Sequence, residues 1–197
     1  MSNLEAEWLQ QARQGSDEAF EHLVEHYQTP VYNLCYRMLG NPQEAEDAAQ
    51  ESFWRAYQAL QRYDPQRSFA TWLLSIAAHY CIDQQRRRRT TSIPIDDAIE
   101  EIFPDHAPDP ETATMVSEQD KQLHRLLAAL NPEDRAVLVL RYWYDLSDAE
   151  IGQTLSMSTS AVKSRLHRAR LQLARNWRAS VSEATRAERK CHESPAF

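Results

Sequence analysis

The chain has 197 residues, a formal net charge of −7 and a hydrophobic content of 42%. This length allows one medium-sized domain or two small ones, and the apolar content is sufficient for a hydrophobic core. Only 3 glycines stand against 9 prolines, which is too little turn chemistry for a protein of many short strands. We therefore predict an all-α fold.

Several classes of protein are disfavoured by the same totals. No stretch approaches 18 apolar residues and the first residues lack the pattern of a signal peptide, so we expect no membrane insertion and a cytoplasmic location. Cys35, Cys81 and Cys191 are odd in number and far apart, which argues against a disulfide framework or a Cys-rich zinc site. The negative net charge does not exclude binding to nucleic acid, because a local patch of positive charge can bind it whatever the net charge of the chain.

Helix start and stop signals divide the first 90 residues. Ser16 is a potential N-cap, Pro30 precedes what we expect to be a separate helix, and Gly40 ends that helix. Asn41, Pro42 and the carboxylate three residues after the cap start the next helix. The first 90 residues therefore predict a bundle of successive helices.

The helix that begins after Asn41 has two different faces. Small and aromatic residues form an apolar stripe that includes Ala45, Ala49 and Phe53. Its other face places Trp54 among carboxylates, and protein interfaces favour such aromatic anchors. The carboxylates could simply form a solvated face, but Trp54 favours a face that binds a partner.

A loop, "QRYDPQRS", leads to the potential cap Ser68 and to a further helix. Apolar residues recur along that helix with helical spacing from Phe69 to Tyr80, which indicates a core face. The helix continues into four consecutive arginines, 86–89, where cations complement the helix dipole. This run could bind nucleic acid, act as a targeting tag or form a solvated helix end, and we favour the first of these, as affinity for phosphate.

The composition changes between residues 90 and 116. This stretch contains four prolines and seven acidic residues, with no lysine or arginine, which is typical of a linker. We therefore predict an N-terminal helical domain at 1–90, an acidic proline-containing linker at 91–116, a C-terminal helical domain at 117–178, and a frayed polar tail at 179–197.

The C-terminal domain carries the pattern of a helix-turn-helix. Ser147 and Glu150 form a capping box for a short helix, and a tight turn then leads to a longer basic helix. Between Met157 and Arg178 there are six basic residues and no acid. We expect Trp177 to end the buried stripe of the longer helix, and the first turns of that helix to enter the major groove of DNA.

These stretches together resemble the extracytoplasmic-function (ECF, group IV) sigma factors of bacterial RNA polymerase. "EAEDAAQESFWRAYQAL" is similar to sigma region 2.2, "YDPQRSFATWLLSIAAHYCIDQQRRRR" to regions 2.3 and 2.4, and "LNPEDRAVLVLRYWYDLSDAEIGQTLSMSTSAVKSRLHRARLQL" to region 4. The resemblance covers about residues 16–178. Gly152 departs from the family pattern where Ala is frequent, and Ser156 where the turn often has Gly.

The resemblance implies a role for each surface. The helix at region 2.2 would dock on the clamp helices of the largest polymerase subunit through Asp47, Gln50, Glu51 and Trp54. The −10 promoter element would be bound by Tyr63, Thr71, Trp72, Ser75, His79, Arg86 and Arg87, with Tyr63 as a stacking wall for an extruded base. The −35 element would be read by Ser160, Lys163, Ser164, His167 and Arg168.

The function implied is that of a promoter-specificity subunit that binds core RNA polymerase, recognises the −35 and −10 elements, assists DNA melting and directs initiation. Its partners would be the clamp helices, the flap of the second-largest subunit and promoter DNA, with an anti-sigma factor as a further candidate. The alternative is a stand-alone helix-turn-helix regulator that binds duplex DNA. It would leave the acidic helix and residues 69–89 without a role.

The sequence offers no catalytic chemistry. It has no Gly-rich phosphate loop and no pairing of a nucleophile with a base, so we expect no enzymatic activity and no cofactor. His22 and His26 have the spacing of a helical metal pair, but no third ligand is identifiable. We therefore predict no metal site.

Overall fold

A computed structural model describes residues 3–91 and 118–192, with side chains for residues 4–89 and 120–180. Its elements are α1 (Asn3–Arg13), α2 (Asp17–Leu39), α3 (Pro42–Ala59), the short 3-10 helix η1 (Leu60–Arg62), α4 (Phe69–Thr91), α5 (Glu118–Ala128), α6 (Pro132–Trp143), α7 (Asp148–Thr154) and α8 (Thr159–His192). No strand occurs in the described ranges, which confirms the all-α prediction. Most of the predicted acidic linker lies outside the described residues.

The predicted capping residues begin and end the helices. The Ser16 side chain accepts the Ala19 N–H, and Gly40 closes α2 at a φ of 78°, in the left-handed region that glycine enters without a Cβ penalty. Asn41 caps α3 by accepting the Glu44 N–H at 3.1 Å. The capping box at the start of α7 is also present, with both of its hydrogen bonds. Local sequence signals therefore account for where these helices start and stop.

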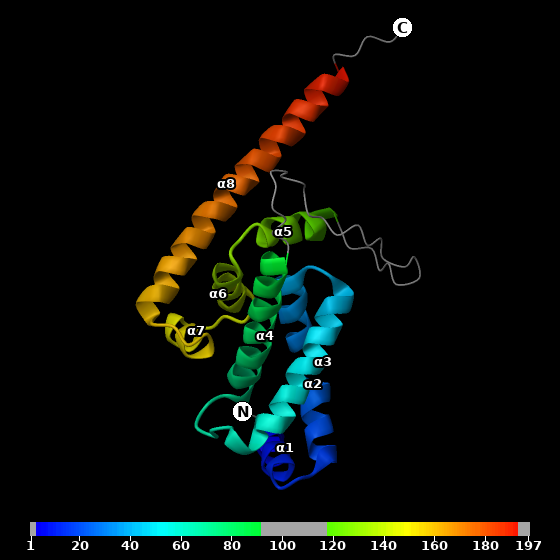
Figure 1. The fold of residues 1–197 in the computed structure, drawn as a ribbon, viewed down its shortest axis with the longest axis vertical. Helices are drawn as coiled ribbons and strands as arrows, with labels where there is room; N and C mark the ends of the chain where they lie inside the picture. Colours follow the sequence, from blue (N-terminus) through cyan, green and yellow to red (C-terminus); the bar gives the residue numbers. More distant parts are fainter. Residues whose placement is uncertain (1–2, 92–117, 193–197) are drawn as a thin grey trace.

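Two lobes pack against each other (Figure 1). The first contains α1 to α4, and the second contains α5 to α8, with α6 lying against α2 and α4. Fully buried residues of α6 and α7, such as Val137, Leu140 and Ile151, belong to the same hydrophobic cluster as Leu34 and Leu73 of the first lobe. The lobes are therefore joined by a shared apolar core as well as by the chain.

The prediction of separate helices on the two sides of Pro30 is wrong, because α2 runs through this residue without a break. A proline inside a helix loses one backbone hydrogen bond and crowds the preceding turn. Here the buried residues Leu23, Val31 and Leu34 continue the same stripe across the proline and pack against the rest of the bundle. Tertiary packing therefore outweighs the local cost.

The far end of the chain also differs from expectation. The helix α8 continues to His192, so the polar tail that we expected to fray from residue 179 is helical over most of its length. This helix leaves the body of the second lobe and projects away from it (Figure 1). Trp177, which we expected to be buried, is 49% exposed.

Candidate binding surfaces

The outer face of α3 carries the four residues predicted to bind a protein partner. Asp47, Gln50 and Trp54 are exposed, and Glu51 is half-buried beside Arg55, with 2.7 Å between Glu51 Oε1 and Arg55 Nε. The Trp54 side chain is 56% exposed and stacks on Tyr57 at 6.2 Å between ring centroids. The opposite stripe of α3 is buried, so this acidic and aromatic face is held outward.

The loop after α3 is organised around Tyr63. This side chain is only 3% exposed, its ring packs edge-on against Phe69 and lies 5.1 Å from Trp72, and its hydroxyl donates to the Arg67 carbonyl. Burial, with the nearby carboxylates of Glu5 and Asp64, raises the pKa of Tyr63. The ring therefore shapes the loop, and its open stacking surface is small.

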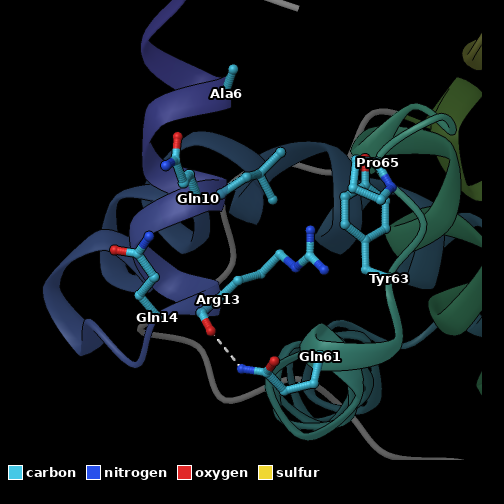
Figure 2. Close-up of a pocket in the computed structure, with 8 residues that line it drawn as sticks. Ala6, Gln10, Arg13, Gln14, Gln61, Tyr63 and Pro65 are labelled. Carbon is cyan, nitrogen blue, oxygen red and sulfur yellow. Dashed lines mark hydrogen bonds between the residues drawn. The ribbon is translucent and has the colours of Figure 1, made fainter.

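A cavity of about 430 Å³ lies between this loop and α1 (Figure 2). Its walls combine polar and apolar side chains from both elements: Ala6, Leu9, Gln10, Arg13, Gln14, Gln61, Tyr63 and Pro65. The Arg13 side chain extends toward Tyr63, and Gln61 Nε2 donates to the Arg13 carbonyl at 2.6 Å, which ties the loop to α1. No motif in the sequence marks α1, so we predicted no role for this helix.

The predicted −10 face of α4 is partly covered by the second lobe. Thr71 and Trp72 are half-buried, and Ser75 Oγ donates to the Thr154 carbonyl of α7 at 2.8 Å. His79 is exposed, with its Nδ1 atom 2.8 Å from the Ser75 carbonyl oxygen. The face that we expected to meet DNA is therefore in contact with α7.

The four consecutive arginines at the end of α4 lie close to other parts of the fold. Arg86 forms an ion pair with Glu133 of α6 and lies 3.7 Å from Asp83. Arg88 forms an ion pair with Glu44 of α3, and Arg89 Nη2 donates to the Leu130 carbonyl at 3.3 Å. Arg87 is exposed. This basic run connects α4 to three other parts of the fold.

The first turns of α8 present an open basic face. Its five predicted DNA-contacting side chains are all exposed, while Val162, Leu166 and Ala169 on the opposite side are buried: Ser160, Lys163, Ser164, His167 and Arg168. Their spacing of three and four residues places them on one side of the helix. This part of α8 therefore has the form of a recognition helix.

The turn before α8 depends on two small residues. Ser156 has a φ of 55°, a left-handed conformation that glycine adopts more readily than serine. A Cβ atom on Gly152 would lie 2.7 Å from the Met157 carbonyl oxygen, so the turn passes too close for a larger residue. The departures from the family pattern at both positions therefore have steric consequences.

An acidic residue that the sequence analysis overlooked supports this helix. Asp134 is 6% exposed and accepts hydrogen bonds from Arg165 at 2.6 Å and from Arg168 at 3.5 Å. Its position after a proline made it look like an ordinary first-turn carboxylate. A low exposure cannot be read from that local pattern, because it is produced by the packing of α6 against α8.

Other classes of site find no support in the described residues. No three His, Cys, Asp or Glu side chains there come together as a metal site would require. His22 lies beside the Trp8 ring, at 5.3 Å between centroids. Across the same ranges, no helix is both long enough and apolar enough to cross a membrane.

The fold and these surfaces define a two-lobed helical protein of the sigma-70 type. The sequence matches the family models described as Sigma-70 region 2 over residues 23–91 and Sigma-70, region 4 over residues 120–173. A solved complex of CnrH with the cytosolic domain of CnrY has the same fold, with a TM-score of 0.66 and 24% identity. The match covers 90% of this chain and 99% of that one.

Two relatives are more informative about the family. The ECF RNA polymerase sigma factor SigW of Bacillus subtilis is 36% identical over 86% of this chain and 95% of its own length. The RNA polymerase sigma-H factor of Pseudomonas aeruginosa is 32% identical over 82% of this chain and 88% of its own length. The chain therefore belongs to the ECF sigma factors of RNA polymerase, as the sequence analysis predicted.

Proposed function

We propose that this protein is a promoter-specificity subunit that binds core RNA polymerase in the cytoplasm, recognises −35 and −10 elements, assists melting and directs initiation, with no catalysis of its own. One observation carries the proposal. A single chain holds an exposed acidic and aromatic face on α3 and an exposed basic recognition face on α8, on opposite lobes. A subunit that links core polymerase to promoter DNA needs both a protein-binding face and a DNA-binding face.

The first lobe, with the helix α4, is proposed to serve as the region 2 domain over residues 1–90. Asp47, Gln50, Glu51 and Trp54 would dock on the clamp helices of the largest polymerase subunit. An exposed Trp beside carboxylates suits an interface anchor with polar surroundings. Thr71, Trp72, Ser75, His79, Arg86 and Arg87 would contact the −10 element, with Tyr63 shaping the loop that receives an extruded base.

The second lobe is proposed to serve as the region 4 domain over residues 117–178. Lys163 and Arg168 have the donors that pair with guanine edges in the major groove, and Ser160, Ser164 and His167 lie on the same face. This lobe would also contact the flap of the second-largest subunit. The stand-alone helix-turn-helix alternative explains this lobe alone and gives the α3 face no role, so the family assignment disfavours it.

An anti-sigma factor is a proposed regulator. The support is indirect: two structures of similar fold are complexes of CnrH with the cytosolic domain of CnrY and of RpoE with the anti-sigma factor NepR. Co-purification of a tagged chain from its own host would test this proposal. Recovery of polymerase subunits without any further protein that blocks the α3 or α4 surfaces would count against it.

Run-off transcription tests the main proposal. Purified core polymerase is incubated with a genomic fragment library, with and without this protein, and new start sites are expected when it is present. The double variant Asp47→Ala, Trp54→Ala should lose affinity for core polymerase by at least tenfold. Glu46→Ala with Gln58→Ala, exposed on the same helix, is the matched control. Absence of new start sites with the parent protein would refute the proposal.

The −35 reading is tested separately. Lys163→Ala should relax the sequence preference of the −35 element at one or two positions, at a cost of roughly 1–3 kcal/mol for the preferred base. Arg178→Ala, farther along α8, should leave that preference unchanged. Selection of −35 variants by sequencing transcripts from a randomised promoter library gives both measurements.

A further inference from the structure

The helix α1 is fixed on the bundle by one of its faces. Leu9 and Ala12 are buried in the main hydrophobic cluster, and the Tyr27 hydroxyl of α2 donates to the Glu5 carboxylate at 2.7 Å. The match to the Sigma-70 region 2 model begins only at residue 23, so α1 precedes the residues that this model covers. The cavity between α1 and the Tyr63 loop therefore has one wall that the family match does not assign.

Main-chain hydrogen bonds close the C-terminal end of α1. The Gly15 N–H donates to the Ala12 carbonyl at 3.0 Å. The Ser16 N–H donates to the Gln11 carbonyl at 3.1 Å. Gly15 has a φ of 96°, the left-handed conformation in which glycine often ends a helix. Arg13 lies in the last turn of α1, so these bonds hold its main chain in place.

The Arg13 side chain extends from this turn toward Tyr63 (Figure 2). It is half-buried, and the residues that line the cavity include no other cation and no carboxylate. The cavity is therefore suited to an anion. A planar guanidinium group binds the oxygens of a phosphate group with two parallel hydrogen bonds, which makes phosphate the anion that this group fits well.

Two carboxylates act on the Tyr63 side of the cavity, and both already accept hydrogen bonds from other groups. Glu5 accepts the Tyr27 hydroxyl, and the Asp64 Oδ1 atom accepts the Gln66 N–H at 3.0 Å. Neither residue lines the cavity. Their charges are thus directed to partners of their own, and the Arg13 guanidinium remains the charged group that faces the cavity.

The other walls suit a planar ring with a polar edge. Figure 2 shows Gln10 and Gln14 on the α1 side, and Pro65 beside Tyr63 on the loop side. Pro65 and Ala6 are exposed and supply apolar surface on which a ring can pack. A glutamine amide carries both donors and an acceptor, and it pairs with the N6 and N7 atoms of adenine through two hydrogen bonds.

The size of the cavity fits a ligand of this kind. Its volume of about 430 Å³ lies within the range of about 300–1,000 Å³ that is usual for small-molecule sites. We propose that the cavity binds one free adenine nucleotide, with a phosphate group on Arg13 and the base between Pro65 and the amides of Gln10 and Gln14. This binding site goes beyond the proposed function, because all of its residues belong to the first lobe.

A bound nucleotide would add a second bridge between α1 and the loop. The first bridge is the hydrogen bond from Gln61 Nε2 to the Arg13 carbonyl. The loop is also the segment that we propose to receive an extruded base, so an occupied cavity would restrain a promoter-contacting segment. That consequence rests on the proposed function, whereas the binding itself does not.

Titration calorimetry of the full chain with adenosine monophosphate tests the binding. We expect saturable binding by the parent. Arg13→Met should weaken it about tenfold, because the phosphate loses its guanidinium while the main-chain carbonyl that binds Gln61 is kept. Arg62→Met, exposed on η1 and outside the cavity lining, makes the same change in charge and should leave the affinity unchanged.

A second variant fills the cavity without altering its charge. Ala6→Phe places a ring where the base would pack, so we expect a loss of affinity of about tenfold. Gln11→Phe adds the same ring to α1 at an exposed position that does not line the cavity, and it should bind as the parent does. Thermal unfolding of each variant verifies that the fold is retained.

Further titrations identify the part of the ligand that is recognised. Adenosine monophosphate should bind about fivefold tighter than cytidine monophosphate, since the amides pair with adenine N6 and N7, and inorganic phosphate should bind most weakly. Equal affinities for adenosine monophosphate and inorganic phosphate would overturn the nucleobase site. No heat of binding at millimolar adenosine monophosphate, or full affinity in Arg13→Met, would overturn the proposal as a whole.

A single-stranded oligonucleotide of mixed sequence separates the free ligand from a DNA strand. If the strand bound in an Arg13-dependent manner and adenosine monophosphate did not bind, the cavity would belong to DNA and the proposal would be wrong. Core polymerase is absent from all of these titrations, so their failure leaves run-off transcription as an independent test of the proposed function.

Discussion

The two helices that we propose for promoter contact, α4 and α8, lie in different surroundings. On α8, the predicted contact residues face outward and Asp134 supports two arginines from beneath. On α4, Ser75 is bonded to Thr154 and Arg86 is paired with Glu133. The proposed −35 surface is therefore open in this structure, whereas the proposed −10 surface is in contact with the second lobe. The two helices show that equally basic sequences can end in different surroundings, because packing between the lobes decides which side chains stay exposed.

Among the substitutions that test this difference, Arg135→Met at the junction between the lobes should have the largest effect on stability. The change removes the charged hydrogen bonds of a buried guanidinium to the Met38, Ala128 and Leu130 carbonyls, so we expect the free energy of unfolding to fall by about 3 kcal/mol. Urea denaturation at pH 7 measures it. Arg175→Met, on the exposed part of α8, should stay within about 0.5 kcal/mol of the parent. Equal stabilities for the two variants would contradict the role given to Arg135.

Gly152→Ala should destabilise the turn that leads into α8, the helix with the exposed contact residues. The added methyl group meets the Met157 carbonyl oxygen at 2.7 Å, so the turn before α8 must move, at a cost of about 2 kcal/mol. Thermal unfolding and −35 footprinting of the assembled holoenzyme are the measurements. Ala149→Ser, exposed on the same short helix, is the control. A Gly152→Ala protein as stable as its parent would contradict the steric explanation, because the turn would then move without a cost in free energy.

Ser156→Gly should have a smaller effect of opposite sign and stabilise the same turn before α8. Serine holds a φ of 55° at this position, and glycine adopts that conformation without the Cβ penalty. The larger freedom of glycine in the unfolded chain offsets part of the gain, so we expect a stabilisation of about 0.5 kcal/mol. Chemical denaturation detects this difference, and a loss of stability would contradict the explanation.

The smallest effect concerns the pH dependence of the ion pair between Glu133 and Arg86. The pKa of Glu133 is lowered in the folded protein, so its contribution is present above its ordinary value near 4.5 and is lost as pH falls through the lowered value. Arg86 is 60% exposed, which limits the pair to about 0.5 kcal/mol. Glu133→Gln should therefore be less stable than the parent at pH 7, and the difference should shrink at pH 3.5. A difference independent of pH would exclude the ion pair.

Local patterns in the sequence predicted much of this fold. The caps at Ser16, Asn41 and Ser147 act over three residues, so they can be read directly, and the helical spacing of polar residues placed one face of α8 outward. The roles of these residues in binding remain predictions. Pro30 misled us because its cost is local, whereas the packing that overcomes it comes from other helices.

The junction between the lobes was beyond local reasoning. Arg86 and Glu133 are 47 residues apart, and Arg135 and Met38 are 97 apart. Nothing in the spacing of charges along the chain pairs such residues. The prediction that the four arginines serve phosphate therefore overlooked their present partners, which only the assembled fold brings within reach.

Those partners change how the protein should respond to ionic strength. A free arginine that takes up a DNA phosphate releases a condensed cation, which makes affinity fall steeply with added salt. Arg86 and Arg88 already hold Glu133 and Glu44. If DNA displaced these carboxylates, each would become an anion that attracts a cation back from solution, and part of the release would be cancelled. The affinity of this chain for promoter DNA should therefore fall less steeply with salt than its number of arginines implies.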